Sequence, residues 1–337
     1  MQPIAYWLPI IWACILGVGV AMYVLLDGFD LGIGILFLSG STEEERDHMM
    51  NSIAPYWDGN ETWLVLGGAG LFVAFPLAYG IIMPALYLPI IIMLLALVFR
   101  GVAFEFRFVS KPHNRWWDRA FSAGAIVATF CQGLVLGGFL QGIMVTDKHF
   151  SGGSFDWLTP FSILCGFALV SGYALLGAGW LMMKTDGELA ARARRQAEVA
   201  LVLTLCFIAA VSIWTPFASE RIQARWFSGN HLLYLWPVPF ATAVVAMIGW
   251  AGIRKGSGLQ AFLSAMALFL LCFLGLGIST SPYLVPPSLT IWDAAAVPES
   301  QIFSLIGVLL FLPLVLAYTA FVYWTFRGKV SEGAGYH

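Results

Sequence analysis

Charged residues are scarce in this chain of 337 residues, because Asp, Glu, Lys and Arg together make up only 11% of it. A typical soluble protein carries about 25%. Hydrophobic residues make up 60% of the chain, and the mean hydropathy is +0.82. No folded arrangement of so few charges gives a water-compatible surface, which excludes a soluble enzyme, a secreted domain and a nucleic-acid-binding protein. The long apolar runs indicate that the lipid bilayer is the solvent.

Cysteine and histidine are also few, and their positions do not suit a disulfide, a metal site or a haem. The five cysteines all lie in apolar stretches without a C-x-x-C pair, which argues against a disulfide framework and a metal site. Haem in a membrane bundle is usually held by a His or Met of a spanning helix. The five histidines fall in predicted loops or at the C-terminus, so we expect this chain to ligate no haem. They are His48, His113, His149, His231 and His337.

No Lys or Arg precedes Arg46, so the N-terminus lacks the basic segment of a cleaved signal peptide and is expected to form a first, uncleaved span. Hydropathy predicts an all-α polytopic membrane protein with nine transmembrane helices in one integral membrane domain, 1–337. The second and third spans are expected to form a tight hairpin. The nine predicted spans are Trp7–Leu26, Thr62–Ala78, Ile81–Phe99, Phe121–Gly142, Pro160–Met183, Val199–Pro216, Leu232–Ala251, Ala261–Ile278 and Ile302–Phe326.

The distribution of basic residues supports this number of spans. With nine spans, the loops on one side receive 14 of the 17 Lys and Arg residues, and those on the other side receive Lys148, Arg221 and Arg225. Cytoplasmic loops carry an excess of basic residues. The sequence therefore predicts an N-terminus outside and a C-terminus in the cytoplasm.

Ionisable residues converge at the predicted cytoplasmic ends of the first three spans. In a membrane protein such residues are candidates for function, because they are costly at membrane depth. Two interpretations stay open: a solvated rim in the headgroup region, or a proton entry path beside a site for a quinone-like head group. The residues are Asp27 and Asp30 after the first span, Trp57, Asp58 and Glu61 before the second, and Arg100 and Glu105 after the third.

Five motifs, in order along nearly the whole chain, carry a family resemblance. They are DGFDLGIG (27–34), MMNSIAPYWDGNETWL (49–64), LVFRGVAFEFR (97–107), TDGEL (185–189) and PSLTIWDA (287–294). With these motifs the sequence resembles subunit II of the cytochrome bd-type quinol oxidases, a group that includes the cyanide-insensitive oxidases.

The resemblance implies a fold of two four-helix bundles, 1–143 and 159–280, plus a peripheral helix, 302–326. It implies a complex in the bacterial cytoplasmic (inner) membrane with subunit I, which carries two b-type haems and a d-type haem, or b-type haems alone in some members. The complex oxidises quinol, reduces dioxygen to water and takes its protons from the cytoplasm. The family pattern also leaves room for a small single-span accessory subunit.

By matching motif positions, the resemblance implies that Asp27, Asp30 and Asp58 belong to a cytoplasmic proton entry. It likewise implies that Trp57 and Arg100 contact a tightly held structural quinone. The family pattern assigns no role to Glu61. The alternative is a proton-coupled transporter, which the position of the acids at the membrane edge argues against, since transporters bind substrate near the midplane. The proline-rich exterior segment 279–300 is expected to pack on this chain or on a partner.

Overall fold

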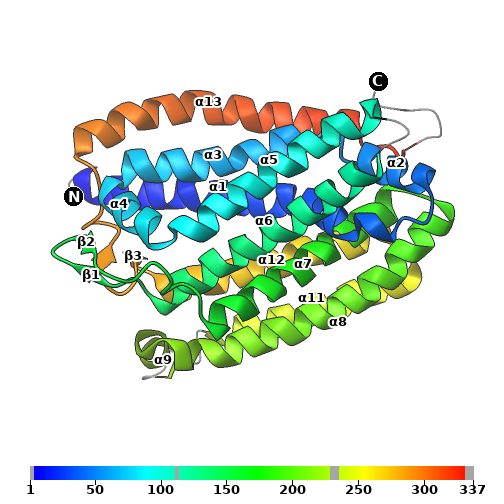
Figure 1. Ribbon diagram of the computed structural model, residues 1–337. Helices are drawn as coiled ribbons and strands as arrows, with labels where there is room; N and C mark the ends of the chain where they lie inside the picture. The colour runs from blue at the N-terminus through cyan, green and yellow to red at the C-terminus, as the bar shows by residue number, and fades with distance from the viewer. Residues whose placement is uncertain (1–3, 111–113, 228–234, 331–337) are drawn as a thin grey trace.

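The computed structural model describes residues 4–110, 114–227 and 235–330 (Figure 1). The start of the predicted span Leu232–Ala251, together with His113, His231 and His337, lies outside these residues. The helices are α1 Ile4–Leu36, α2 Glu43–Asn51, α3 Trp57–Ala74, α4 Pro76–Ala85, α5 Tyr87–Val109, α6 Arg115–Gln141, α7 Pro160–Lys184, α8 Gly187–Ala218, α9 Glu220–Phe227, α11 Pro237–Lys255, α12 Gly258–Thr280 and α13 Pro298–Thr325, with a short 3-10 helix η1 at Phe37–Ser39.

Within the described ranges, eight helices are long and apolar enough to cross a membrane: α1, with η1 continuing it, and α5, α6, α7, α8, α11, α12 and α13. They correspond to eight of the nine predicted spans. The other predicted span corresponds to α3, which has 18 residues and begins with the polar turn WDGNE. A crossing by α3, and with it the count of nine, stays a prediction.

The predicted tight hairpin between the second and third spans is wrong. Phe75 interrupts the helix with φ −138° and ψ 61°, and Pro76 begins the separate short helix α4. Proline lacks the N–H that would continue the hydrogen-bond ladder of α3, and it suits the first turn of a new helix. The predicted end of the third span is also wrong, because α5 continues past Arg100 to Val109.

Close contacts between glycines hold the centre of the molecule together. Helix α1 packs against α3, α6 and α7. A Cβ atom on Gly32 of α1 would lie 1.9 Å from the carbonyl oxygen of Tyr173, and one on Gly177 of α7 would lie 2.4 Å from the backbone of Gly32. Such small residues let helix backbones approach closely. The two predicted four-helix units thus share one interface, and their division into separate bundles stays a prediction.

Helix α13 runs along the outer side of the molecule, next to α3 (Figure 1). Its large apolar side chains are mostly exposed, and Gln301 is its one buried residue within the described part of the chain. The assignment of 302–326 as a peripheral helix beside two bundles stays a prediction.

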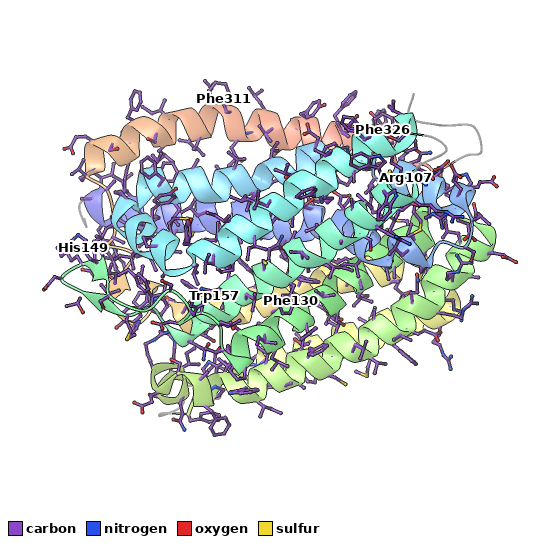
Figure 2. The ribbon with its side chains drawn as sticks, in the orientation of Figure 1. Arg107, Phe130, His149, Trp157, Phe311 and Phe326 are labelled. Carbon is purple, nitrogen blue, oxygen red and sulfur yellow. The ribbon has the colours of Figure 1, made fainter. Side chains whose placement is uncertain are left out.

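Ion pairs join several elements at the end of the bundle that carries α2. Arg107 lies at the end that carries α2, and His149 lies at the opposite end (Figure 2). At the α2 end, Arg107 is fully buried and donates to Asp118 at 2.6 Å and to Asp47. Thr42 caps α2 by accepting from the backbone N–H of Glu45 at 3.1 Å. Ion pairs therefore fasten the surface helix α2 to the ends of α5 and α6.

The segment 279–300, which is predicted to lie outside, packs on this chain. It contains the hairpin β3 Tyr283–Val285 and β4 Leu289–Thr290, near a second hairpin of β1 Val145–Thr146 and β2 His149–Phe150. Val285 is fully buried. The backbone N–H of Ala296 donates to the carbonyl oxygen of Ala74 at 2.9 Å, and the Trp292 ring donates to that of Tyr6 at 3.1 Å.

Candidate functional site: a buried polar cluster

Two acids of the DGFD motif lie inside the helix bundle. Asp27 and Asp30 are three residues apart, hence on one face of α1, and both are fully buried. Helix α1 continues to Leu36, so the two acids lie one to three turns before its end. Their burial excludes the solvated-rim interpretation for these two residues. The prediction that they sit at the end of the helix is wrong.

Arg100 joins three helices through two ion pairs. One terminal nitrogen lies 2.6 Å from Oδ1 of Asp27 on α1, and the other lies 2.7 Å from Oε2 of Glu61 on α3. The guanidinium is 2% exposed and the Glu61 side chain 30% exposed. A planar guanidinium can serve two carboxylates at once. Glu61, to which the sequence assigned no role, is therefore a direct partner of Arg100.

Asn60 connects the second acid to the peripheral helix. Its amide nitrogen donates to Oδ2 of Asp30 at 2.8 Å and to the carbonyl oxygen of Leu26 at 3.3 Å. Its amide oxygen accepts from the Tyr323 hydroxyl of α13 at 3.0 Å. The other oxygen of Asp30, Oδ1, is buried and has no hydrogen-bond partner among the described residues. Asp30 thus has an amide donor where Asp27 has a cation.

A second set of hydrogen bonds begins one turn before Asp27. Gln132 of α6 donates to the Tyr23 hydroxyl at 2.7 Å and accepts from the Tyr173 hydroxyl of α7 at 2.9 Å. Tyr23 is four residues before Asp27, so the two side chains share one face of α1. Polar side chains therefore continue from the acids toward α6 and α7. Sequence reasoning missed Asn60 and Gln132, although Asn60 stands inside the specific WDGN motif.

Trp57 and Asp58 occupy different environments at the start of α3. Trp57 is half-buried, its ring centroid lies 5.1 Å from that of Phe104, and its ring edge faces Gly101. Asp58 is exposed, as is Glu105 on α5. The predicted convergence of acids is therefore confirmed for Asp27, Asp30 and Glu61, while Asp58 and Glu105 lie outside the buried cluster.

Within residues 4–110, 114–227 and 235–330, no three His, Cys, Asp or Glu side chains are placed to hold a metal ion. His48 lies on α2 and His149 on β2. Both are at the ends of the bundle (Figure 1). The absence of a haem ligand from this chain stays a prediction.

The chain is similar to known proteins over nearly its whole length. Residues 8–326 match the family described as cytochrome bd terminal oxidase subunit II. The chain is 31% identical to "Cytochrome bd-I ubiquinol oxidase subunit 2" of Escherichia coli K12, over 96% of this chain and 95% of that protein. It is 29% identical to "Cytochrome bd ubiquinol oxidase subunit 2" of Bacillus subtilis, over 96% of both.

A solved structure shares the fold. A chain of the bd oxidase from Geobacillus thermodenitrificans superposes with a TM-score of 0.75 at 18% sequence identity, covering 95% of this chain and 98% of that one. At this identity the likeness supports the fold alone. The family match over residues 8–326 and the curated relatives show that this chain belongs to the cytochrome bd terminal oxidase subunit II family.

Proposed function

We propose that this chain is the second subunit of a quinol oxidase in the bacterial inner membrane. In the complex, a haem-carrying subunit I oxidises quinol and reduces dioxygen to water, with b-type haems and a d-type haem. The family membership and the names of the curated relatives support this assignment. This chain itself holds no haem in the proposal, and a small single-span accessory subunit is a further partner.

The chain's own contribution is a route for protons, and the buried acid cluster carries this proposal. The carboxyl groups of Asp27 and Glu61 share the cation Arg100, and the carboxyl group of Asp30, on the same face of α1 as Asp27, accepts from the amide of Asn60. Carboxyl groups accept and release protons, and intramembrane acids facing a bundle interior mark proton relays. Protons enter from the exposed side at Asp58, pass the half-buried Glu61, and reach Asp27 and Asp30.

The amide of Asn60 keeps one oxygen of Asp30 in place. The other oxygen, Oδ1, is left free of hydrogen bonds among the described residues, and it is the atom that takes and gives the proton in this proposal. Transfer onward leaves the chain for the partner, where dioxygen consumes the protons.

The structural quinone is proposed to bind beside Trp57. The half-buried Trp57 ring and Phe104 form an aromatic wall. Both terminal nitrogens of Arg100 are engaged by carboxylates, but its Nε is buried without a partner among the described residues. These features fit a flat ring whose carbonyl accepts one hydrogen bond. A bound quinone supplies a redox-active ring, which this chain would hold and orient.

A change of Trp57 to Ala tests the quinone proposal. We expect the purified complex to retain several-fold less tightly bound quinone, measured by solvent extraction and chromatography, because the ring loses its stacking surface. Tyr318, an exposed aromatic residue of α13, offers a control as Tyr318→Ala. Equal quinone content in Trp57→Ala and in the native complex would contradict the assignment of this residue.

A proton-coupled transporter remains the second candidate. The buried position of Asp27 and Asp30 removes the argument that the acids lie only at the membrane edge. The family membership favours the oxidase.

Co-purification distinguishes the two candidates. The chain is tagged, extracted in mild detergent, and assayed for its reduced-minus-oxidised visible spectrum and for quinol-dependent oxygen uptake. An oxidase subunit brings haem bands and oxygen uptake with it, in company with a larger chain. If gentle extraction and crosslinking in intact membranes both find no haem-containing partner, the oxidase assignment fails.

A further inference from the structure

A groove runs between α7 and α8, and Leu36 of α1 also lines it. The two helices lie side by side (Figure 1), and the groove between them holds about 570 Å³. Its walls are apolar and include large side chains that are exposed, such as Phe167, Val199 and Leu203. Pockets that bind small molecules usually have volumes of about 300–1,000 Å³ and are mostly apolar with a few polar groups.

Apart from Ser171, which pairs with Thr204, the polar groups of the groove gather at one end. Arg192, Arg195 and Gln196 line it there, and their spacing of three and four residues places them on one face of α8. Arg192 donates to Glu45 at 2.6 Å, and Gln196 donates to the Ser39 hydroxyl at 2.7 Å. Arg195 is exposed and has no hydrogen bond or ion pair to another described residue. Its positive charge is therefore uncompensated at the groove's mouth.

The length of the groove matches one leaflet of a bilayer. The lining residues on α8 extend from Arg192 to Phe207. The 12 residue-to-residue steps from Arg195 to Phe207 correspond to a rise of about 18 Å, and half of the hydrocarbon core is about 15 Å. With Arg195 at headgroup depth, Phe207 reaches the bilayer centre. A single extended hydrocarbon chain fits such a path.

We propose that the α7–α8 groove binds an anionic glycerophospholipid, with one acyl chain between the helices and the phosphate beside Arg195. Arginine suits phosphate because its fork of N–H donors matches the phosphate oxygens. Basic pockets between transmembrane helices bind anionic headgroups in this manner. The Glu45–Arg192 pair fixes the position of Arg192 beside the headgroup, while Arg195 supplies the unpaired charge.

Other ligands of the groove would contact its apolar walls but would not need Arg195. The isoprenoid tail of a quinone, or an apolar helix of a partner, would cover Phe167 and Leu203 and gain nothing from an unpaired cation. Dependence on Arg195 therefore separates an anionic lipid from both.

Native mass spectrometry of the purified oxidase complex tests the site. The complex is delipidated in mild detergent and titrated with phosphatidylglycerol or phosphatidylcholine. The variant Arg195→Gln is expected to bind phosphatidylglycerol about fivefold more weakly, the factor equivalent to about 1 kcal/mol for one basic residue at an anionic surface. Arg115→Gln removes an exposed arginine of α6 that does not line the groove, and its affinity is expected to be unchanged.

A second variant tests the acyl-chain path. Leu203→Trp places a larger side chain at a groove position that is 47% exposed, so the fold tolerates it while the groove narrows. We expect it to reduce phosphatidylglycerol binding, and a photoreactive phosphatidylglycerol to crosslink to α7 and α8 in the native complex only. The proposal is overturned if Arg195→Gln binds phosphatidylglycerol as the native complex does. It is equally overturned if phosphatidylcholine binds to the native complex as tightly as phosphatidylglycerol does. The same holds if a quinone or a helix of a partner crosslinks in the groove.

Discussion

Replacing Arg100 by Met should destabilise the protein far more than the loss of an ordinary salt bridge. The guanidinium is 2% exposed and pairs with Asp27, which is fully buried, and with the partly exposed Glu61. Removing one member of a buried pair leaves an uncompensated charge and costs about 3–5 kcal/mol. An exposed pair contributes about 0–1 kcal/mol. Since Glu61 is partly solvated, most of the expected cost comes from Asp27.

The free energy of unfolding is measured by a denaturant titration in mixed micelles for Arg100→Met and for the double variant Arg100→Met/Asp27→Asn. Neutralising Asp27 removes the unpaired buried charge, so the double variant should recover more than half of the loss. The exposed Arg115 serves as a control, because Arg115→Met should change the stability by less than about 0.5 kcal/mol. A loss below about 1 kcal/mol in Arg100→Met, or no recovery in the double variant, would refute the reasoning.

Three further predictions follow from particular contacts. Asn60→Leu leaves the hydrogen-bonding groups of Asp30 and a tyrosine unsatisfied, so unfolding in micelles should show a loss of about 2–6 kcal/mol, at about 1–3 kcal/mol per group. Gly177→Val puts side-chain atoms where a Cβ already lies 2.4 Å from the α1 backbone, so gel filtration should show a loss of folded complex. The hydrogen bond from Arg192 lowers the pKa of Glu45 below its ordinary value of 4.5. The stabilisation that this ion pair gives the folded protein is therefore complete above pH 4.5 and is lost as the pH falls through the lower pKa of the folded state. Glu45→Gln should abolish this contribution to acid sensitivity when stability is measured over a pH series.

The sequence predicts the helical membrane class and most of the spans because both depend on the length of apolar runs. It fails around Phe75, since hydropathy does not register a backbone break followed by a proline within an apolar stretch. It also fails at the end of α5, where Arg100 and Arg107 are polar yet stay helical because carboxylates of other helices neutralise them.

The sequence predicts only the part of the candidate site that lies on one helix, because contacts between helices leave no local pattern. Spacing on one helix places Asp27 beside Asp30, but the pairing of Arg100 with Glu61 depends on how α3 and α5 pack. Asn60 and Gln132 act through single hydrogen bonds across helices. The local sequence around a residue does not indicate which residue of another helix it will hydrogen-bond.

Proton uptake by the complex in liposomes tests the central claim most directly. The native complex, Asp30→Asn and the control Glu105→Gln, which alters an exposed acid of α5, are reconstituted and supplied with quinol. Oxygen consumption is followed together with a pH-sensitive dye. We expect Asp30→Asn to lower both rates about tenfold or more, with an unchanged haem spectrum, and Glu105→Gln to behave as the native complex. Rates of Asp30→Asn equal to those of the control would contradict a proton route through this chain.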